Sequence, residues 1–188
     1  MLKYLLLIIT FILPSCQKVE FIDDIIFDYA QLPKIIINAE SKYINEIYQT
    51  QFIDPYIEHS LKIPPLLHFK KWAHSNLQTI GVENYLNINI VNASLTKLII
   101  DNNEAKSYEE KKIFQYEIIY LVEYILYDDG NNILAKTLVE SKNSVTSGKF
   151  ISLFEAEKII DNLILDSLKD FTKKSNELLK THMYQFLL

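Results

Sequence analysis

The second half of the chain alternates between apolar and polar side chains with a period of two residues. From 114 to 126, one side of the alternation is wholly aromatic or aliphatic, whereas the other mixes Gln115, Glu117 and Glu123 with aliphatic residues. A period of two is typical of a β-strand, and apolar residues on both sides are typical of a strand inside a sheet. The pattern therefore predicts a central strand that is covered on one side and shielded on the other.

Neighbouring patterns predict three further strands. The sequence Asp-Asp-Gly-Asn at 128–131 is a hairpin turn, so residues 133–141 are expected to return as the next strand. Residues 86–100 begin as an alternation of aliphatic residues with asparagine, which predicts a half-buried strand that continues through a bulge. The isoleucine-rich run at 34–39 predicts a first strand that extends toward Tyr48.

Two segments change to a helical period. Between Pro65 and Gly81, apolar residues recur every three or four positions around Trp72, which predicts an amphipathic helix of about four turns. Ser152 and Glu155 form a capping box, and a second helical face follows it to near the C-terminus. This longer helix could also lie on a membrane surface, but its polar face mixes aspartates with lysines, which favours packing on the sheet.

These elements follow one another in the order strand, helix, three strands, helix. The predicted fold class is α+β: a four-stranded, mostly antiparallel sheet with two helices on one face, in the order β-α-β-β-β-α. The opposite face of the sheet is expected to be half exposed and rich in tyrosine. A partner could dock there.

The N-terminus carries the strongest functional signal. A short positive segment precedes an apolar run at 4–13, which has signal-peptide length and is too short to span a bilayer. The run ends in Leu13-Pro14-Ser15-Cys16, which resembles the bacterial lipobox, although proline is a less usual residue there. The lone cysteine could otherwise end an ordinary signal or lie in a core helix. Lipid attachment at Cys16 is the favoured interpretation, because only a thiol supplies the required nucleophile.

The lipobox predicts three parts of the chain: a lipoprotein signal peptide at 1–15, a lipidated tether at 16–33 and a single α+β domain at 34–188. Acyl chains on the cysteine would hold the domain on the membrane without spanning it. Gln17 follows the cysteine, where inner-membrane lipoproteins of many proteobacteria carry aspartate. We therefore expect an outer-membrane lipoprotein of the cell envelope that faces the periplasm.

Charge limits the choice of partners. The chain of 188 residues has a formal net charge of −5, and its 19 basic residues are all lysine. Nucleic-acid binding depends on basic patches, and bidentate recognition of phosphate depends on arginine. We therefore expect no nucleic-acid partner.

The sequence offers little catalytic or metal-binding chemistry. Glu58-His59-Ser60 places an acid, a base and a hydroxyl side by side, without a G-x-S-x-G sequence. His68 and His74 are six residues apart, so they point to different sides of a helix and cannot share a zinc ion. A cluster of aspartates could bind a cation but lacks the spacing of a calcium loop: Asp23, Asp24 and Asp28. We expect no enzyme activity, no metal site and no cofactor.

Several short motifs together resemble a family of uncharacterised proteobacterial lipoproteins. They are Pro55-Tyr-Ile-Glu-His59 with Ile63-Pro-Pro65, Lys71-Trp-Ala73 with Leu77 and Gly81, Ile90-Val-Asn-Ala-Ser94, and Ser152-Leu-Phe-Glu155 with Leu168-Lys-Asp170. This chain has lysine where that family tends to use arginine. The order of elements is also similar to the lipopolysaccharide-assembly lipoprotein (LptE) family and to auxiliary lipoproteins of ABC-type lipid transport.

The resemblance implies a non-catalytic accessory or assembly factor that binds an envelope protein complex or a lipid. Two other functions stay open: a structural envelope lipoprotein without specific cargo, and a weak hydrolase that uses His59 and Ser60.

Overall fold

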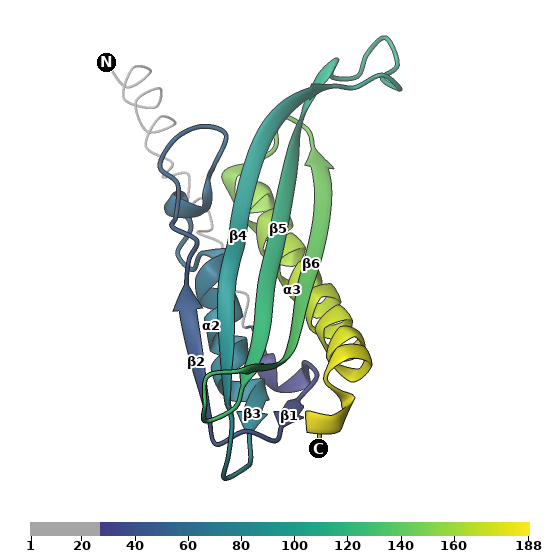
Figure 1. The fold of residues 1–188 in the computed structure, drawn as a ribbon. Coiled ribbons are helices and arrows are strands. Elements are labelled where there is room, and N and C mark those ends of the chain that lie inside the picture. The colour runs from purple at the N-terminus through teal and green to yellow at the C-terminus, as the bar shows by residue number, and fades with distance from the viewer. Residues whose placement is uncertain (1–26) are drawn as a thin grey trace, which may run out of the picture.

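The computed structural model describes residues 27–188, in which four strands form the main sheet in the order β2-β4-β5-β6 (Figure 1). The strands are β2 (Ser41–Glu46), β4 (Tyr85–Asp101), β5 (Lys112–Tyr127) and β6 (Ile133–Ser147). The β4-β5 and β5-β6 pairs are antiparallel, whereas β2 is parallel to β4. The predicted α+β fold class, with its mostly antiparallel four-stranded sheet, is confirmed.

Strand β4 contains the predicted bulge. Its pairing with β5 runs from Tyr85 opposite Tyr127 to Asp101 opposite Lys112, with a register shift between Ile90 and Asn92. A bulge leaves one extra residue in one strand and restores the alternation afterwards. For this reason both halves of β4 place aliphatic side chains on the same face of the sheet.

The first predicted strand is wrong in detail, because it is two strands in two different sheets. β1 (Ile35–Ile37) is parallel to β3 (Leu77–Thr79) in a separate two-stranded sheet. The C-terminal residues also join this small sheet. The amide of Asn38 donates to the carbonyl of Phe186 at 2.7 Å, and the amide of Leu188 donates to the carbonyl of Ile36 at 3.1 Å.

The helix α2 (Pro65–Asn76) ends about five residues before the predicted position at Gly81. The amide group of Asn76 donates to the carbonyl oxygens of Tyr29 and Leu32 at 2.7 and 2.8 Å. Leu77 is fully buried and already belongs to β3. The hydrogen bonds of β3 with β1 therefore replace another turn of helix, which the local apolar period could not indicate.

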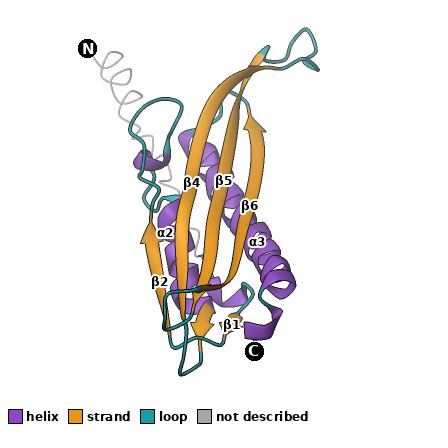
Figure 2. Ribbon diagram, viewed as in Figure 1, coloured by secondary structure: helices purple, strands orange, loops and turns teal. Residues whose placement is uncertain are grey.

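Both long helices cover one face of the main sheet, as predicted (Figure 2). The helix α3 (Leu153–His182) begins with the predicted capping box, in which the Glu155 amide donates to Ser152 Oγ at 3.2 Å and the Ser152 amide donates to the Glu155 carboxylate at 3.0 Å. The apolar face of α3 is buried against the sheet, in agreement with the packing that its mixed charges favour. No helix within 27–188 combines the length and the apolar character needed to cross a bilayer.

An aromatic cluster forms the centre of the core. Phe69 and Trp72 of α2 lie against Phe171 of α3, with ring centroids 5.4 and 6.2 Å apart and nearly perpendicular planes. Tyr120 of β5 lies 5.7 Å from the Phe171 ring. All four side chains are fully buried. Trp72 is therefore the central contact that the helical period predicted.

The expected tyrosine-rich, half-exposed face is present only in part. Tyr43, Tyr85 and Tyr127 lie together on the face without helices, with neighbouring ring centroids 6.0 and 5.1 Å apart.

The other tyrosines of β5 are covered, contrary to the expectation. Tyr116, Tyr120 and Tyr124 lie on the side of β5 that the helices cover, and all three are buried. The Tyr120 hydroxyl donates to the Pro65 carbonyl at 3.3 Å, and the Tyr124 hydroxyl lies 3.4 Å from Ser175 Oγ. Because these hydroxyls have partners, the helices can cover the side of the strand that has the larger apolar surface.

Removing the central aromatic ring should destabilise the domain strongly. We expect Trp72→Ala to lower the free energy of unfolding by about 3 to 5 kcal/mol, because it leaves a large cavity between two helices and the sheet. The exposed Phe154→Ala should change it by less than about 0.5 kcal/mol. Urea unfolding followed by far-UV circular dichroism measures both values, and equal losses would contradict this description of the core.

Candidate functional site

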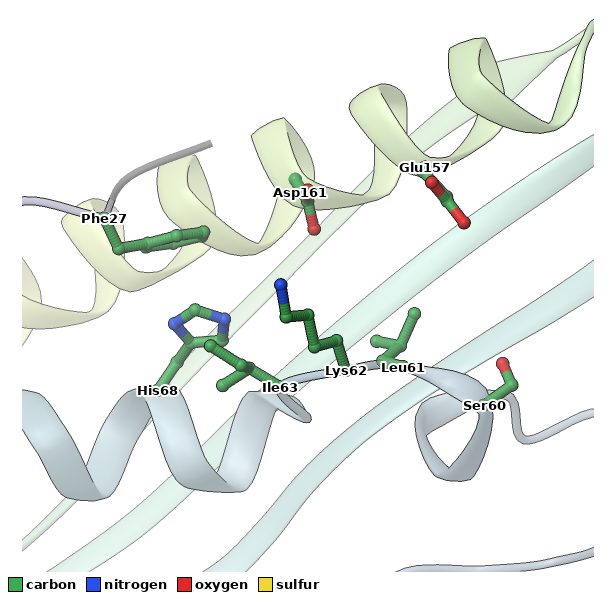
Figure 3. Close-up of a pocket in the computed structure, with 8 residues that line it drawn as sticks. All are labelled: Phe27, Ser60, Leu61, Lys62, Ile63, His68, Glu157 and Asp161. Atoms are coloured by element: carbon green, nitrogen blue, oxygen red, sulfur yellow. The ribbon is translucent and has the colours of Figure 1, made fainter. Parts of the chain in front are cut away.

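A small pocket lies where the loop before α2, the first turn of α2 and the N-terminal half of α3 meet (Figure 3). Its volume is about 250 Å³. Residues from four segments line it: Phe27, Ser60, Leu61, Lys62, Ile63, His68, Glu157 and Asp161. Pockets that enclose a drug-sized ligand typically have about 300 to 1,000 Å³. This pocket is below that range, so we do not assign it a small-molecule ligand.

His68 forms the buried wall of the pocket. Its Nδ1 lies 2.6 Å from the Tyr29 hydroxyl, and its ring centroid lies 3.9 Å from that of Phe27. Burial, assisted by the positive charge of Lys71, lowers the pKa of His68 to about 4. Burial also raises the pKa of Tyr29 to about 12. Both groups are therefore neutral near pH 7, and the hydrogen bond joins a neutral phenol to a neutral imidazole.

The mouth of the pocket carries charges of both signs. The Lys62 amine points toward the Asp161 carboxylate, and Glu157 lies one turn earlier on α3 (Figure 3). The charges on Lys62, Asp161 and Glu157 thus face each other where the loop before α2 meets α3. The lining residues connect these segments of the chain, which is a structural role.

A second cleft of about 450 Å³ lies between β6 and α3. Its polar lining includes Asn143, whose side-chain amide donates to the Asp170 carboxylate at 3.1 Å, together with Asn162 and Asp166. The two carboxylates are exposed. They lack the burial that usually accompanies a catalytic carboxylate.

The structure does not assemble the acid, base and hydroxyl of Glu58, His59 and Ser60. The buried Glu58 carboxylate accepts hydrogen bonds from the Tyr48 hydroxyl and from the amides of Gln51 and Leu95, at 3.3 and 3.4 Å for the two amides. His59 Nδ1 lies 3.1 Å from the Gln51 carbonyl, and the Ser60 hydroxyl donates to the Ile57 carbonyl at 2.7 Å. Each group thus makes local contacts that stabilise the short helix η2 (Glu58–Ser60) and its neighbours.

The buried carboxylate of Glu58 also perturbs its partner. Burial, followed by the hydrogen bond and the negative charge of Glu58, raises the pKa of Tyr48 above its ordinary value. A buried carboxylate that accepts several hydrogen bonds is stabilised in place. Its role is to hold the loop 48–58 against β4, which sequence inspection missed because the three contacts join distant positions.

The other candidate ligands do not converge. His74 and His182 are exposed, and Asp28 caps the short helix η1 (Tyr29–Gln31) by accepting from the Ala30 amide at 3.0 Å. Asp23 and Asp24 lie outside the described residues. Within the described range, no three His, Cys, Asp or Glu side chains are arranged to hold a metal ion.

Cys16 also lies outside the described residues, so its lipid attachment stays a prediction. The structure does show that the folded domain begins earlier than residue 34. Leu32 is buried, η1 packs on α2, and Phe27 contacts His68. Residues 27–33, which the sequence assigned to the tether, therefore pack as part of the domain.

The face of the sheet without helices is a mixed surface that the sequence did not reveal in full. Two cross-strand ion pairs join β5 to β6, Glu123 with Lys136 at 2.6 Å and Glu117 with Lys142 at 3.0 Å. Contact with Lys136, and then with Asn89, keeps the pKa of Glu123 below its ordinary value. Aliphatic side chains fill the same face between the pairs: Ile119, Leu121, Ile125 and Leu138. We call this surface the open face.

Known proteins provide one weak structural likeness and no family for this chain. No protein-family model matches the chain, and no curated protein matches it. Among solved structures, the chain is similar to the rare lipoprotein B from Shewanella oneidensis, with a TM-score of 0.37 and 12% identity over 75% of this chain and 95% of that chain. A likeness of this size supports no conclusion about function, and the family resemblance inferred from the sequence stays a prediction.

Acid should weaken the domain through His68. The folded-state pKa of about 4 lies below the unfolded value of about 6.5, so below pH 6.5 the unfolded chain binds a proton that the folded chain does not. Stability is therefore lost as the pH falls from about 6.5 to about 4, by up to about 1.4 kcal/mol per pH unit. Urea unfolding at several pH values should show a smaller acid-dependent loss for His68→Gln than for the wild type. The exposed His74→Gln should keep the wild-type loss, and an unchanged pH profile in His68→Gln would contradict the neutral buried imidazole.

Glu58 should matter to stability, whereas its two neighbours should not. We expect Glu58→Ala to lower the free energy of unfolding by about 2 to 3 kcal/mol, because the Tyr48 hydroxyl and two amides lose their acceptor. The double variant His59→Ala/Ser60→Ala should stay within about 0.5 to 1 kcal/mol of the wild type. Thermal or urea unfolding measures both losses. If the double variant lost more stability than Glu58→Ala, the hydrogen bonds of Glu58 would not be the ones that hold the loop 48–58 in place.

Proposed function

We propose that the protein is a lipid-anchored cell-envelope protein, a non-catalytic accessory or assembly factor that binds an envelope protein complex or a lipid. The observation that carries the proposal is Leu13-Pro14-Ser15-Cys16 at the end of an apolar run of signal-peptide length. Two or three acyl chains on Cys16 would anchor the chain, since each buried methylene contributes about 0.8 kcal/mol.

The fold is compatible with this kind of tethering. Phe27 already packs on His68 of the domain, so at most the segment 17–26 separates the domain from the proposed anchor. The sheet and helices would therefore stay close to the lipid surface. A location on the outer membrane, facing the periplasm, is part of the proposal and is supported by Gln17 in place of aspartate.

The open face supports a binding function over a purely structural one. It joins an aliphatic strip with two fixed ion pairs, and exposed surfaces of this mixed kind are typical of protein interfaces. The local hydrogen bonds of Glu58, His59 and Ser60 give no support to a hydrolase that uses these groups.

The anchor can be tested directly by intact mass. After expression with its own leader in a bacterium that processes lipoproteins, the protein should begin at Cys16 and carry a diacylglyceryl group. It should remain in the membrane fraction after high-salt and carbonate washing. Cys16→Ala should lose the modification and leave the membrane fraction on washing, because the apolar run at 4–13 is too short to span a bilayer.

A matched substitution shows whether the effect is specific to the thiol. Ser60→Ala is as small a change as Cys16→Ala and should keep the diacylglyceryl group and the wild-type fractionation, its mass differing only by the lost oxygen. Firm membrane association of Cys16→Ala would remove the basis for the proposed function. A modified protein that yields neither a stable envelope partner nor a bound lipid after mild detergent extraction would favour the purely structural alternative.

A further inference from the structure

Exposed apolar side chains gather at one end of the molecule. The β4-β5 hairpin projects beyond the other strands and the helices, and α3 begins at the same end (Figure 1). We call this the hairpin end, residues 98–114 and 148–154. Its most exposed apolar side chains are Phe150 at 88%, Tyr108 at 79% and Leu153 at 77%. Three more are exposed there: Leu98, Ile99 and Phe154.

Hydrogen bonds join the two segments of the hairpin end into one surface. The Glu110 carboxylate accepts from the amide of Lys149 at 2.6 Å, which links the hairpin loop to the segment before α3. The amide of Asn102 donates to the Lys111 carbonyl at 2.9 Å and closes the base of the loop. The apolar side chains thus stand on a connected backbone. Exposed apolar side chains gathered at one end of a molecule mark an interaction site more often than scattered single residues do.

Lysines surround the aromatic rings of this end. The Lys97 amine lies 3.8 Å from the centroid of the Phe114 ring, and that of Lys149 lies 5.9 Å from the same ring. The Lys106 amine lies 6.0 Å from the centroid of Tyr108. Aromatic rings with lysines beside them are typical of segments at a lipid-water interface, where apolar parts enter the acyl region and amines reach the headgroups.

The charge of the hairpin loop is nearly balanced. Between 101 and 112 the lysines are accompanied by a similar number of acids: Asp101, Glu104, Glu109 and Glu110. Attraction of net charge to anionic headgroups would therefore be weak. Apolar contact is the force that this surface offers to a bilayer.

The chain before Phe27 is long enough to bring a bilayer to this end. Phe27, the first described residue, lines a pocket together with Asp161 of α3. Leu153 is eight residues earlier on α3, about 12 Å at 1.5 Å per residue. The eleven steps from Cys16 to Phe27 can span at most about 40 Å, so an acyl chain on Cys16 can reach a bilayer at the hairpin end.

The opposite end, with the β3-β4 and β5-β6 turns, also exposes apolar side chains. They are Ile80, Val82, Ile133, Leu134, Tyr184 and Leu188. The tether can reach this end too, because the Tyr29 carbonyl accepts from the Asn76 side chain at 2.7 Å and β3 follows Asn76 directly. Exposure and reach therefore do not distinguish the two ends. The lysines do, because within residues 27–188 the amines that lie over aromatic rings all belong to the hairpin end or its immediate base: Lys97, Lys106 and Lys149.

We propose that the hairpin end rests in the interfacial region of the bilayer that holds the acyl chains of Cys16, so that Phe150, Leu153 and Tyr108 contact lipid. This inference rests on the proposed lipid anchor and adds the orientation of the domain on the membrane. With the hairpin end in lipid, the long axis of the sheet stands away from the bilayer. The open face is then available to a partner in the aqueous compartment.

Tryptophan fluorescence in vesicles tests the orientation. Trp72 is fully buried and gives the same background emission in every variant, so one added tryptophan reports its own surroundings. Phe150→Trp and Val82→Trp are matched, because the two positions are 88% and 87% exposed at opposite ends of the molecule. Each lipidated full-length variant is reconstituted into vesicles of phosphatidylethanolamine and phosphatidylglycerol, with and without brominated acyl chains. Intact mass is recorded on the same preparation.

The added tryptophan of Phe150→Trp should be quenched by brominated acyl chains and protected from aqueous iodide. That of Val82→Trp should show the opposite behaviour. The orientation is overturned if the two variants respond alike, if only Val82→Trp responds to bromine, or if Phe150→Trp is protected from both quenchers, which would indicate contact with protein. The mass measurement separates the proposed anchor from the proposed orientation. If brominated chains quench Phe150→Trp although the mass shows an unmodified Cys16, the lipid anchor is wrong and the lipid contact of the hairpin end is still supported.

Discussion

The structure depends on the burial of one aromatic cluster between two helices and a sheet. Phe69 and Trp72 from α2, Phe171 from α3 and Tyr120 from β5 come from distant parts of the sequence and are all fully buried. Burying large rings provides the main favourable free energy of folding, and edge-to-face packing adds to it. The position of both helices, and hence of every loop at either end of the sheet, follows from this contact.

Sequence patterns predicted the elements well where a period extends over many residues. The central strand, the bulge in β4, the hairpin turn and the capping box of α3 are present as expected, because each depends on local chemistry. The errors are in the first third of the described chain. There β1 and β3 are only three residues long, and their pairing with each other ended α2 early. Short strands give no usable period, and their partners are set by tertiary contacts.

The choice of covered face shows a second limit. The tyrosines of β5 were expected on a half-exposed face, but the helices cover three of them, and the hydroxyls of Tyr120 and Tyr124 have hydrogen-bond partners in the core. The ion pairs of the open face join residues of adjacent hairpin strands, a register that the turn at 128–131 could have indicated. The hydrogen bonds of Glu58 could not be foreseen, because its partners Tyr48, Gln51 and Leu95 approach only in the folded chain.

The small sheet has a consequence for how the protein acquires its structure. Strand β1 is hydrogen-bonded on one side to β3 and on the other to residues 186–188, so nearly the whole described sequence lies between these partners. Contacts between such remote segments form late, after the intervening loop has been closed. In a chain that emerges from its N-terminus, β1 therefore lacks this second neighbour until residues 186–188 have followed, and the small sheet is completed only then.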